Sequence, residues 1–318
     1  MIGSVIGLSG LLGVTEFLSP STKKGEALHF KEVGFSLQRG SPQSRGYSKR
    51  RRRIIEALQI LEQTRAGSRL LEKAKEKWQW DQLEQLATLF RWGNVSKTDA
   101  ILTRQLDLQN GKEVYSREVT IFLKWNQTLS ELVLDLAHEL THATHGPAWN
   151  PYDPNLTAAR YIQLAIEGDG GEVDALYAEC KIAGELSQRY GMEFERCRDF
   201  ESKDAQGLSR SIIRDEFYKV GQHREALEKN LKNSRLPLSS NEPSLISSTG
   251  NAPYPVALFY EFQELNRIAC LNTQRRLASL SSSTSIKKTN DSVAFMDKRC
   301  QSKQQEVSST RSSSTHQR

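Results

Sequence analysis

The sequence has few cysteines and no long hydrophobic run, and both absences narrow the class of protein. The four cysteines are Cys180, Cys197, Cys270 and Cys300. They form no C-x-x-C pair, so they predict neither a zinc ribbon nor a thioredoxin-type redox site. Four cysteines in 318 residues are also too few for a disulfide framework of the kind found in small secreted proteins. No stretch of about 20 residues lacks charged side chains, so no membrane span is predicted.

The middle of the chain has no excess of basic residues. The net charge is +6, but residues 1–53 carry ten Lys and Arg against three Asp and Glu, and residues 281–318 carry seven against three. Residues 54–280 therefore carry a net charge of −5. A nucleic-acid-binding domain normally has its basic surface on the folded part, so no nucleic-acid partner is expected.

Composition divides the chain into three parts. Residues 1–48 begin with apolar residues that lack the basic start and cleavage site of a secretory signal, and they continue as a Ser-, Gly- and Lys-rich segment. We predict a flexible N-terminal region there. Residues 49–280 form the predicted folded domain, within which the Ser-, Pro- and Asn-rich residues 233–255 form a linker or long loop. Residues 281–318 form a Ser-rich basic tail, predicted to be disordered.

The basic run Lys49–Arg53 has two interpretations. Such a run can be a nuclear-localisation signal or a patch that binds an anionic surface. Apolar residues follow at helical spacing, beginning with Ile54 and Leu58, which favours the solvated start of a helix. A second helical pattern covers Leu70–Leu89.

Strand signals follow the helical segments. Asn110-Gly111 lies between residues 105–109 and 112–115, which is a strong hairpin signal. Val119–Trp125 alternates between apolar and other side chains, as a strand with one apolar face does. We expect this strand to be the edge against which an extended peptide pairs.

The next helix carries the residues with the clearest chemistry. Thr128-x-x-Glu131 is a capping box at its start, and Gly146-Pro147 ends it, so the helix runs from about Leu129 to His145. It contains His138-Glu139-Leu140-Thr141-His142, an H-E-x-x-H motif. On a helix, residues four apart share a face, so both imidazoles can reach one metal ion.

This motif predicts a zinc site. Three of the chain's six histidines, His138, His142 and His145, fall within eight residues. Zinc with three protein ligands keeps a fourth position for water and lowers the pKa of that water to about 7. Glu139 lies beside the metal and can take a proton from the water. We therefore expect Zn²⁺ as cofactor and Glu139 as general base.

The third ligand is expected to be a carboxylate. A three-histidine metzincin would need Gly and His where the chain has His145 and Ala148, so that class is excluded. Glu172 is the preferred candidate, because it opens a strongly periodic helix that runs to about Tyr190. The small residues Ala175 and Ala178 in its first turns would let the two helices approach closely.

Two other carboxylates stay open as the third ligand. Glu179 is seven residues after Glu172 and lies on the same helix face. It is either the ligand or a partner that holds a histidine ring. Glu167 precedes the Gly-rich segment Gly168–Gly171.

These motifs resemble a known class of enzyme. His138-Glu139-x-x-His142 followed by Glu172-x-x-Ala175 resembles the gluzincin type of zinc metallopeptidase. The segment 172–178 resembles the third-ligand helix of ImmA/IrrE-like metallopeptidases. Residues 136–143, with Thr64-x-x-Gly67 upstream, are similar to NleD-like bacterial effectors and to related uncharacterised metallopeptidases. The resemblance covers about residues 54–190, and it implies that His138, His142 and Glu172 bind zinc and that Glu139 is general base and then general acid.

Five further residues are weaker candidates. Asp135 lies one turn before His138 and is a candidate for orienting an imidazole, and His145 is a candidate for substrate binding. Zincins often use a Tyr or His to stabilise the developing oxyanion. By residue type alone, Tyr177, Tyr190 and His223 qualify.

Together these observations predict a single α+β zincin-like domain, mostly helical, with a small antiparallel sheet and disordered flanks. The expected function is zinc-dependent hydrolysis of peptide bonds in a polypeptide substrate. One alternative is a metal-binding regulatory or interaction module with little peptidase activity. Another is binding of nucleic acid or anionic membranes through Lys49–Arg53 and the basic tail. Oligomeric state stays open, as does the choice between a cytoplasmic protein and a secreted effector.

Overall fold

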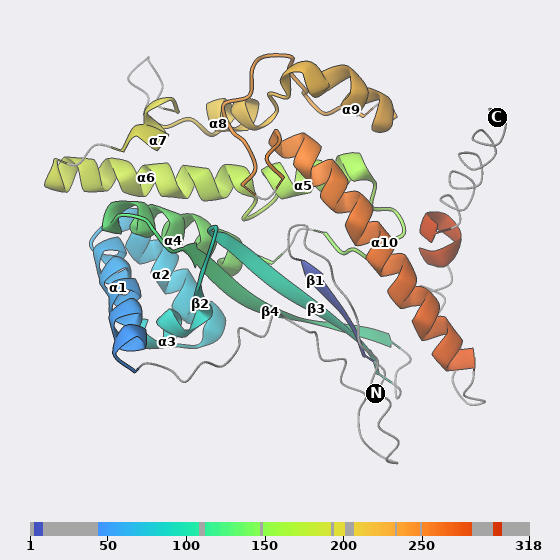
Figure 1. Ribbon diagram of the computed structural model, residues 1–318, viewed down its shortest axis with the longest axis horizontal. Helices are drawn as coiled ribbons and strands as arrows, with labels where there is room; N and C mark the ends of the chain where they lie inside the picture. Colours follow the sequence, from blue (N-terminus) through green and yellow to red (C-terminus); the bar gives the residue numbers. More distant parts are fainter. Residues whose placement is uncertain are drawn as a thin grey trace, which may run out of the picture.

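The computed structural model describes residues 3–8, 44–107, 112–146, 149–191, 194–200, 207–232, 234–248, 250–281 and 295–300. Its larger helices and strands are shown in Figure 1. The helices are α1 (Ser44–Glu62), α2 (Arg65–Trp78), α3 (Leu83–Leu86), α4 (Leu129–Thr144), α5 (Ala158–Glu167), α6 (Glu172–Tyr190), α7 (Glu195–Arg198), α8 (Arg210–Phe217), α9 (Arg224–Asn230) and α10 (Tyr254–Ser281). The strands are β1 (Gly3–Leu8), β2 (Phe90–Gly93), β3 (Lys97–Asp107) and β4 (Lys112–Lys124).

The fold is a predominantly helical α+β domain, as the sequence predicts. The four strands form one small sheet in the order β1-β3-β4-β2. β3 and β4 pair antiparallel with Asp107 opposite Lys112, which confirms the hairpin. β2 pairs parallel with β4, so the sheet is mixed and the expectation of an antiparallel sheet is wrong.

The expectation that Val119–Trp125 forms an edge is wrong at Ile121 and Phe122, which pair with a strand on each side. Residues 121–124 of β4 pair with β2 on one side, and residues up to Phe122 pair with β3 on the other. The local alternation of side chains gives no sign of this second partner. β1 pairs with β3 only from Ala100 onward. Among the described strands, the outer edge of β3 at Lys97–Asp99 is therefore left without a partner strand.

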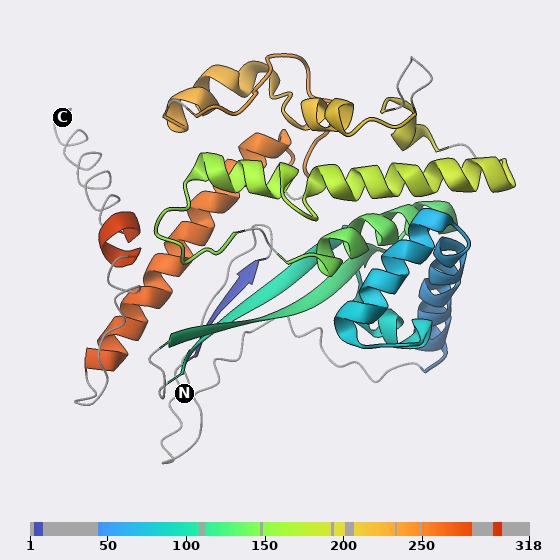
Figure 2. The same ribbon diagram turned by 180° about the vertical axis from the view of Figure 1, so that it is seen from behind.

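Helix α4 is the centre of the domain. It lies between the sheet and α6, with α1 and α2 packed against it, as the two opposite views show (Figure 1 and Figure 2). Every residue from Leu132 to Ala137 is buried, because the helix is covered on several sides. The capping box is present: Thr128 Oγ1 accepts from the Glu131 N–H, and Glu131 Oε2 accepts from the Thr128 N–H.

The cysteines form crosslinks. Cys180 pairs with Cys197 and Cys270 pairs with Cys300, two disulfides that the sequence analysis did not predict. The Cα atoms of the two pairs lie 5.2 Å and 5.6 Å apart, within the range that a disulfide requires. Tertiary packing brings them together across separations of 17 and 30 residues, and no sequence motif records it.

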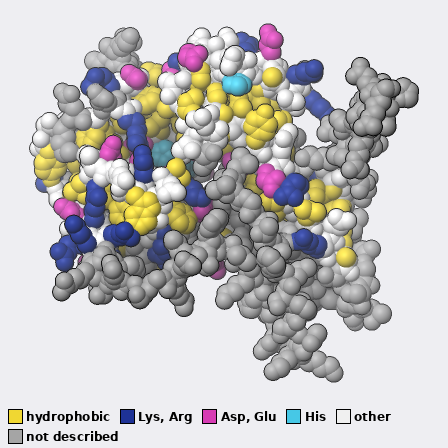
Figure 3. All heavy atoms as spheres, viewed as in Figure 1, with side chains coloured by type: hydrophobic (Ala, Val, Ile, Leu, Met, Phe, Trp, Pro, Cys, Tyr) yellow, Lys and Arg dark blue, Asp and Glu magenta, His cyan; other side chains and the backbone are white. Residues whose placement is uncertain are grey.

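The flanking segments agree with the expectations only in part. Lys49–Arg53 lies inside α1 and Lys49–Arg52 is exposed, which confirms the solvated helix, and dark-blue side chains gather over this part of the surface (Figure 3). Up to α10, which begins at Tyr254, the described part of 233–255 is a long loop packed on the domain, with Leu238 in the hydrophobic core. Within the predicted flexible region 1–48, Gly3–Leu8 forms β1 and α1 begins at Ser44, and within the predicted disordered tail 281–318, Met296–Cys300 forms a helical turn, so the expectation is wrong there. Most of the remaining residues of both regions lie outside the described residues. Among the described helices, none is both long and apolar enough to cross a membrane.

Candidate metal centre

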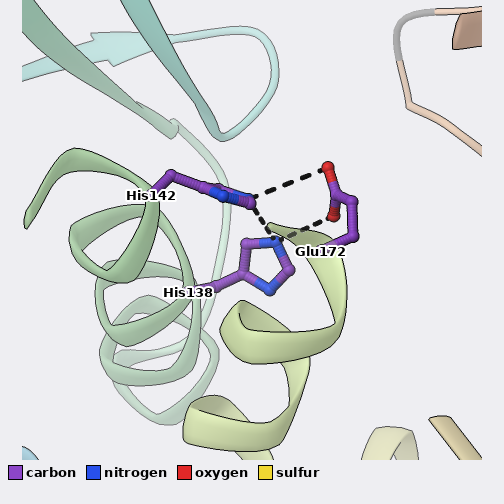
Figure 4. A group of neighbouring side chains, drawn as sticks. All are labelled: His138, His142 and Glu172. Carbon is purple, nitrogen blue, oxygen red and sulfur yellow. Dashed lines mark hydrogen bonds and ion pairs between the residues drawn. The ribbon is translucent and has the colours of Figure 1, made fainter. Parts of the chain in front are cut away.

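The two histidines of the motif face the first residue of α6. His138 and His142 lie one turn apart on α4 and point toward Glu172 (Figure 4). Nε2 of His138 lies 3.2 Å from Nε2 of His142 and 3.5 Å from Oε2 of Glu172. Nε2 of His142 lies 3.8 Å from Oε1 of Glu172. Two Zn–N bonds of ordinary length at a tetrahedral angle separate their nitrogens by about 3.3 Å, so the spacing fits one metal ion.

A glycine turn sets the position of Glu172. Gly170 has a φ of +69°, and a Cβ there would lie 2.3 Å from the Cβ of His145. At Gly171, the N-cap of α6, a Cβ would lie 2.7 to 2.9 Å from three backbone carbonyl oxygens. Only glycine fits both positions without displacing the backbone. The Gly-rich segment therefore permits the close approach of α6 to α4.

Hydrogen bonds fix which nitrogen of each ring faces Glu172. Nδ1 of His142 donates to the carbonyl oxygen of Gly170 at 2.7 Å. A carbonyl oxygen can only accept, so the lone pair of the neutral His142 ring is on Nε2. Nδ1 of His138 donates in the same way to Oε2 of Glu179 at 2.9 Å. Both Nε2 atoms are therefore available to a metal.

The three candidate carboxylates have different positions. Glu172 is the one that lies with both histidines within the spacing of a metal cluster. Glu179 holds the ring of His138, the second role considered for it. Oε1 of Glu167 accepts a hydrogen bond from the hydroxyl of Tyr218 at 2.6 Å, and Glu167 is not in the cluster.

The donor set suits a divalent cation such as zinc. Imidazole nitrogen and carboxylate oxygen are common zinc ligands. Oε2 of Glu172 is buried and makes no hydrogen bond of ordinary geometry among the described residues, although it lies 3.5 Å from Nε2 of His138. A buried carboxylate oxygen that lacks such a hydrogen bond is unfavourable, and a metal ion at the cluster would satisfy it.

The charges of the cluster shift the pKa of each member. Burial lowers the pKa of His138, but hydrogen bonds and charge from Glu172 and Glu179 outweigh it and raise the pKa well above its usual value. Burial lowers the pKa of His142. Burial raises the pKa of Glu172, and the charges of His142 and His138 together with the nearby Tyr254 hydroxyl bring it below its usual value. A metal ion at the cluster would favour the unprotonated forms of both imidazoles.

Glu139 lies beside the cluster, and a hydrogen bond from β3 holds its carboxylate in place. Its Oε2 accepts a hydrogen bond from Thr98 Oγ1 at 2.8 Å, and its backbone oxygen is 2.9 Å from the same hydroxyl. Burial raises the pKa of Glu139 to about 7. A carboxyl group with this pKa can accept and return a proton near neutral pH. Thr98 is in β3, far from the motif in sequence, and no sequence signal points to it.

These residues line a cavity of about 260 Å³. One wall is the N-terminal part of β3, another is the glycine turn, and α10 supplies a third. The lining includes Lys97, Asp99, Trp149, Tyr161, Tyr254 and Glu261. The cluster and Glu139 therefore lie where a ligand can reach them.

Sequence reasoning missed the contribution of α10. Tyr254, the first residue of α10, is close to Glu172, and burial together with the charges of Glu172 and Glu139 raises its pKa well above the usual value. Its phenol stays protonated and can donate a hydrogen bond. Burial raises the pKa of Glu261 to about 7. Both lie more than 100 residues after the motif, so spacing gave no signal.

The weaker candidates are placed differently from the expectation. Tyr177, Tyr190 and His223 do not line the cavity, so the structure does not support their oxyanion role. His145 caps the end of α4, and its ring bonds the carbonyl oxygen of Thr141 at 2.8 Å rather than facing the cavity.

Asp135 does not contact an imidazole. It instead pairs with Arg196, whose Nη1 lies 3.0 Å from Asp135 Oδ1. The ring-orienting role expected of Asp135 is filled by Glu179, because α6 and not the preceding turn of α4 faces Nδ1 of His138.

Comparison with known proteins adds no relative. No family model matches the chain, and no significant match was found among curated proteins or among solved structures. The functional argument therefore depends on the residues and geometry of the site.

Proposed function

We propose that this chain is a zinc-dependent metallopeptidase that hydrolyses peptide bonds in a polypeptide substrate. The observation that carries the proposal is the meeting, in one cavity, of the His138, His142 and Glu172 cluster with the carboxyl group of Glu139. A structural metal site would need the ligands alone. A hydrolase also needs a proton-transfer group beside them and access for a substrate.

Each residue has a defined role in this proposal. His138, His142 and Glu172 hold the ion, with Nδ1 of each ring anchored by Gly170 or Glu179. Zinc, when bound, polarises a carbonyl group and lowers the pKa of water. Glu139 removes a proton from the attacking water and passes it to the leaving amine. Its raised pKa suits both transfers.

Two further groups support peptide hydrolysis. The phenol of Tyr254 is a protonated donor beside the cluster and would donate to the oxyanion that develops on the substrate carbonyl. Lys97–Asp99 lines the cavity and has an outer edge without a partner among the described strands. An extended substrate backbone would pair with this edge.

The test compares Glu139→Gln with Glu76→Gln, a control at an exposed position of α2. We expect both variants to bind about one zinc per chain, measured by elemental analysis. Cleavage of a proteome-derived peptide library, measured by mass spectrometry, should fall by at least about 100-fold only in Glu139→Gln.

Three results would decide against parts of the proposal. Absence of bound metal in correctly folded protein would remove it entirely. Metal bound without cleavage of any peptide by the unsubstituted chain would favour the metal-binding regulatory module. Full activity in Glu139→Gln would remove Glu139 as general base.

A further inference from the structure

A line of contacts leads from the metal centre to a disulfide. Oε2 of Glu179 accepts from Nδ1 of His138 at 2.9 Å, and Oε1 of the same carboxylate accepts from Nη1 of Arg196 at 2.8 Å. Glu179 is almost completely buried, with 1% of its side chain exposed. A buried carboxylate needs its partners to keep both its charge and its orientation. The orientation of the His138 ring therefore depends on Arg196 as well as on Glu179.

Arg196 bridges two carboxylates. The same Nη1 atom lies 3.0 Å from Oδ1 of Asp135, and the other oxygen of Asp135 accepts from the hydroxyl of Ser96. The charges of Glu179 and Asp135 raise the pKa of Arg196 above its usual value. The guanidinium thus joins α4, α6 and α7 at a point next to His138.

The element that carries Arg196 is weak by itself. α7 has four residues and no side-chain cap at its start, and so short a helix is not stable alone. About half of the Arg196 side chain is exposed, so solvent partly screens its ion pair with the buried Glu179. Burial of Cys197 and Phe200 in the hydrophobic core helps to hold this segment, and a covalent crosslink to α6 would restrain it further.

The Cys180–Cys197 disulfide supplies this restraint. Cys180 directly follows Glu179, and Cys197 directly follows Arg196, so the covalent bond joins the backbone beside both partners of the ion pair. The second disulfide, Cys270–Cys300, joins α10 to the segment Met296–Cys300, and neither cysteine is next in sequence to a residue of the cluster or of the Glu179–Arg196 ion pair. The two disulfides therefore differ in their relation to the metal centre.

We propose that Glu179 and Arg196 are positioning residues for His138 and that the Cys180–Cys197 disulfide holds them in place, so that metal affinity depends on the redox state of this pair. The inference rests on the proposed metal site. A dithiol reductant would transfer two electrons and two protons to the disulfide, giving two thiols and leaving the reductant as a disulfide. Both sulfurs are in buried residues, so the exchange requires local opening of α7.

The experiment uses serine variants, because a reducing agent would itself bind zinc. Two double variants of the full chain are compared. The first combines Cys180→Ser with Cys197→Ser, and the second combines Cys270→Ser with Cys300→Ser. Competition with a chromophoric chelator measures the zinc Kd, and the absorption spectrum of the Co²⁺ form reports ligand geometry. We expect the first variant to bind zinc about 10- to 100-fold more weakly, as loss of an outer partner of a ligand does, with an altered Co²⁺ spectrum. The second variant should match the unsubstituted chain.

Two variants that keep both disulfides test Arg196 without altering the crosslink. Arg196→Ala should weaken zinc binding in the same direction, and Arg196→Lys should restore part of the loss, because a cation remains. Combining Arg196→Ala with the Cys180 and Cys197 substitutions should add little further loss, because both changes remove the same support.

The outcomes separate this inference from the proposed function. If the unsubstituted chain binds no metal, the proposed function fails first and the inference fails with it. Two results would remove only the inference, provided that the unsubstituted chain binds zinc. One is a zinc Kd that is the same in the two disulfide variants. The other is an unchanged zinc Kd and Co²⁺ spectrum in Arg196→Ala. Zinc binding without hydrolysis would leave the inference standing and remove the proposed peptidase.

Discussion

The two histidines of the cluster are held in different ways. On one side, His142 is anchored by a backbone carbonyl in the Gly168–Gly171 turn. On the other side, His138 is anchored by the Glu179 side chain, which in turn depends on Arg196 and a disulfide. A backbone anchor is set by the local turn, whereas a side-chain anchor requires several distant elements to be in place. The orientation of the His142 ring therefore depends only on α4 and the turn before α6. The orientation of the His138 ring also depends on Arg196 and on the disulfide.

Removal of Glu172, which lies beside both histidines, should have the largest effect on zinc affinity. Glu172→Ala leaves two imidazoles without a carboxylate. We expect zinc affinity to fall by more than about 100-fold, because loss of a ligand exceeds the effect of losing an outer partner. Glu167→Ala is the control, since Glu167 contacts Tyr218 instead of the cluster. Equal zinc content in the two variants, measured by elemental analysis after dialysis, would exclude Glu172 as a ligand.

A substitution in the Gly168–Gly171 turn tests the backbone that anchors His142. Gly170→Ala requires a left-handed conformation and places a Cβ 2.3 Å from that of His145. We expect a loss of about 3 kcal/mol in the free energy of unfolding, measured by urea denaturation. Gly191→Ala is the matched control: its φ is +65° but nothing lies within 4 Å of the added Cβ, so about 1 kcal/mol is expected. Similar losses would show that the approach to His145 can relax.

A milder substitution tests the contact between the Glu179 side chain and His138. Glu179→Gln keeps the shape of the side chain and removes its charge, so zinc affinity should fall by about tenfold. Glu185→Gln is the control on the same helix, because Glu185 accepts from the Ala66 N–H rather than from a histidine. An unchanged zinc Kd in Glu179→Gln would mean that neutral hydrogen bonding suffices.

The same variant carries a pH signature in the metal-free chain. Glu179 helps to raise the pKa of His138 above its usual value. A raised folded-state pKa stabilises the fold below the unfolded pKa, and this contribution is lost as pH rises through the folded value. The stability lost in Glu179→Gln should therefore be larger at pH 6 than at pH 10, measured by urea denaturation with a metal chelator present.

Local patterns in the sequence predicted the central elements well. The capping box and the glycine stop bounded α4 to within one residue, and the four-residue spacing placed His138 and His142 on one face. Glu172 was preferred because it opens a helix with small residues in its first turns, and it does lie beside both histidines. These predictions succeeded because they depend on helix geometry and on neighbours close in sequence.

Predictions that needed a distant partner failed or were absent. The expected edge strand is interior because β2 pairs with β4. The four cysteines pair across helices. Tyr254, Thr98 and Arg196 reach the site from elements that no motif connects to it.

The sequence by itself determined a capped helix that carries His138, Glu139 and His142, with both imidazoles on one face, because helical periodicity and capping are local. The tertiary structure decided which carboxylate completes the cluster, which ring is held by backbone and which by side chains, and which cysteines pair. Those outcomes depend on how α6 packs against α4, α7 against α6, and α10 against α5 and the segment Met296–Cys300. Packing depends on the burial of many residues at once and leaves no short pattern in the chain.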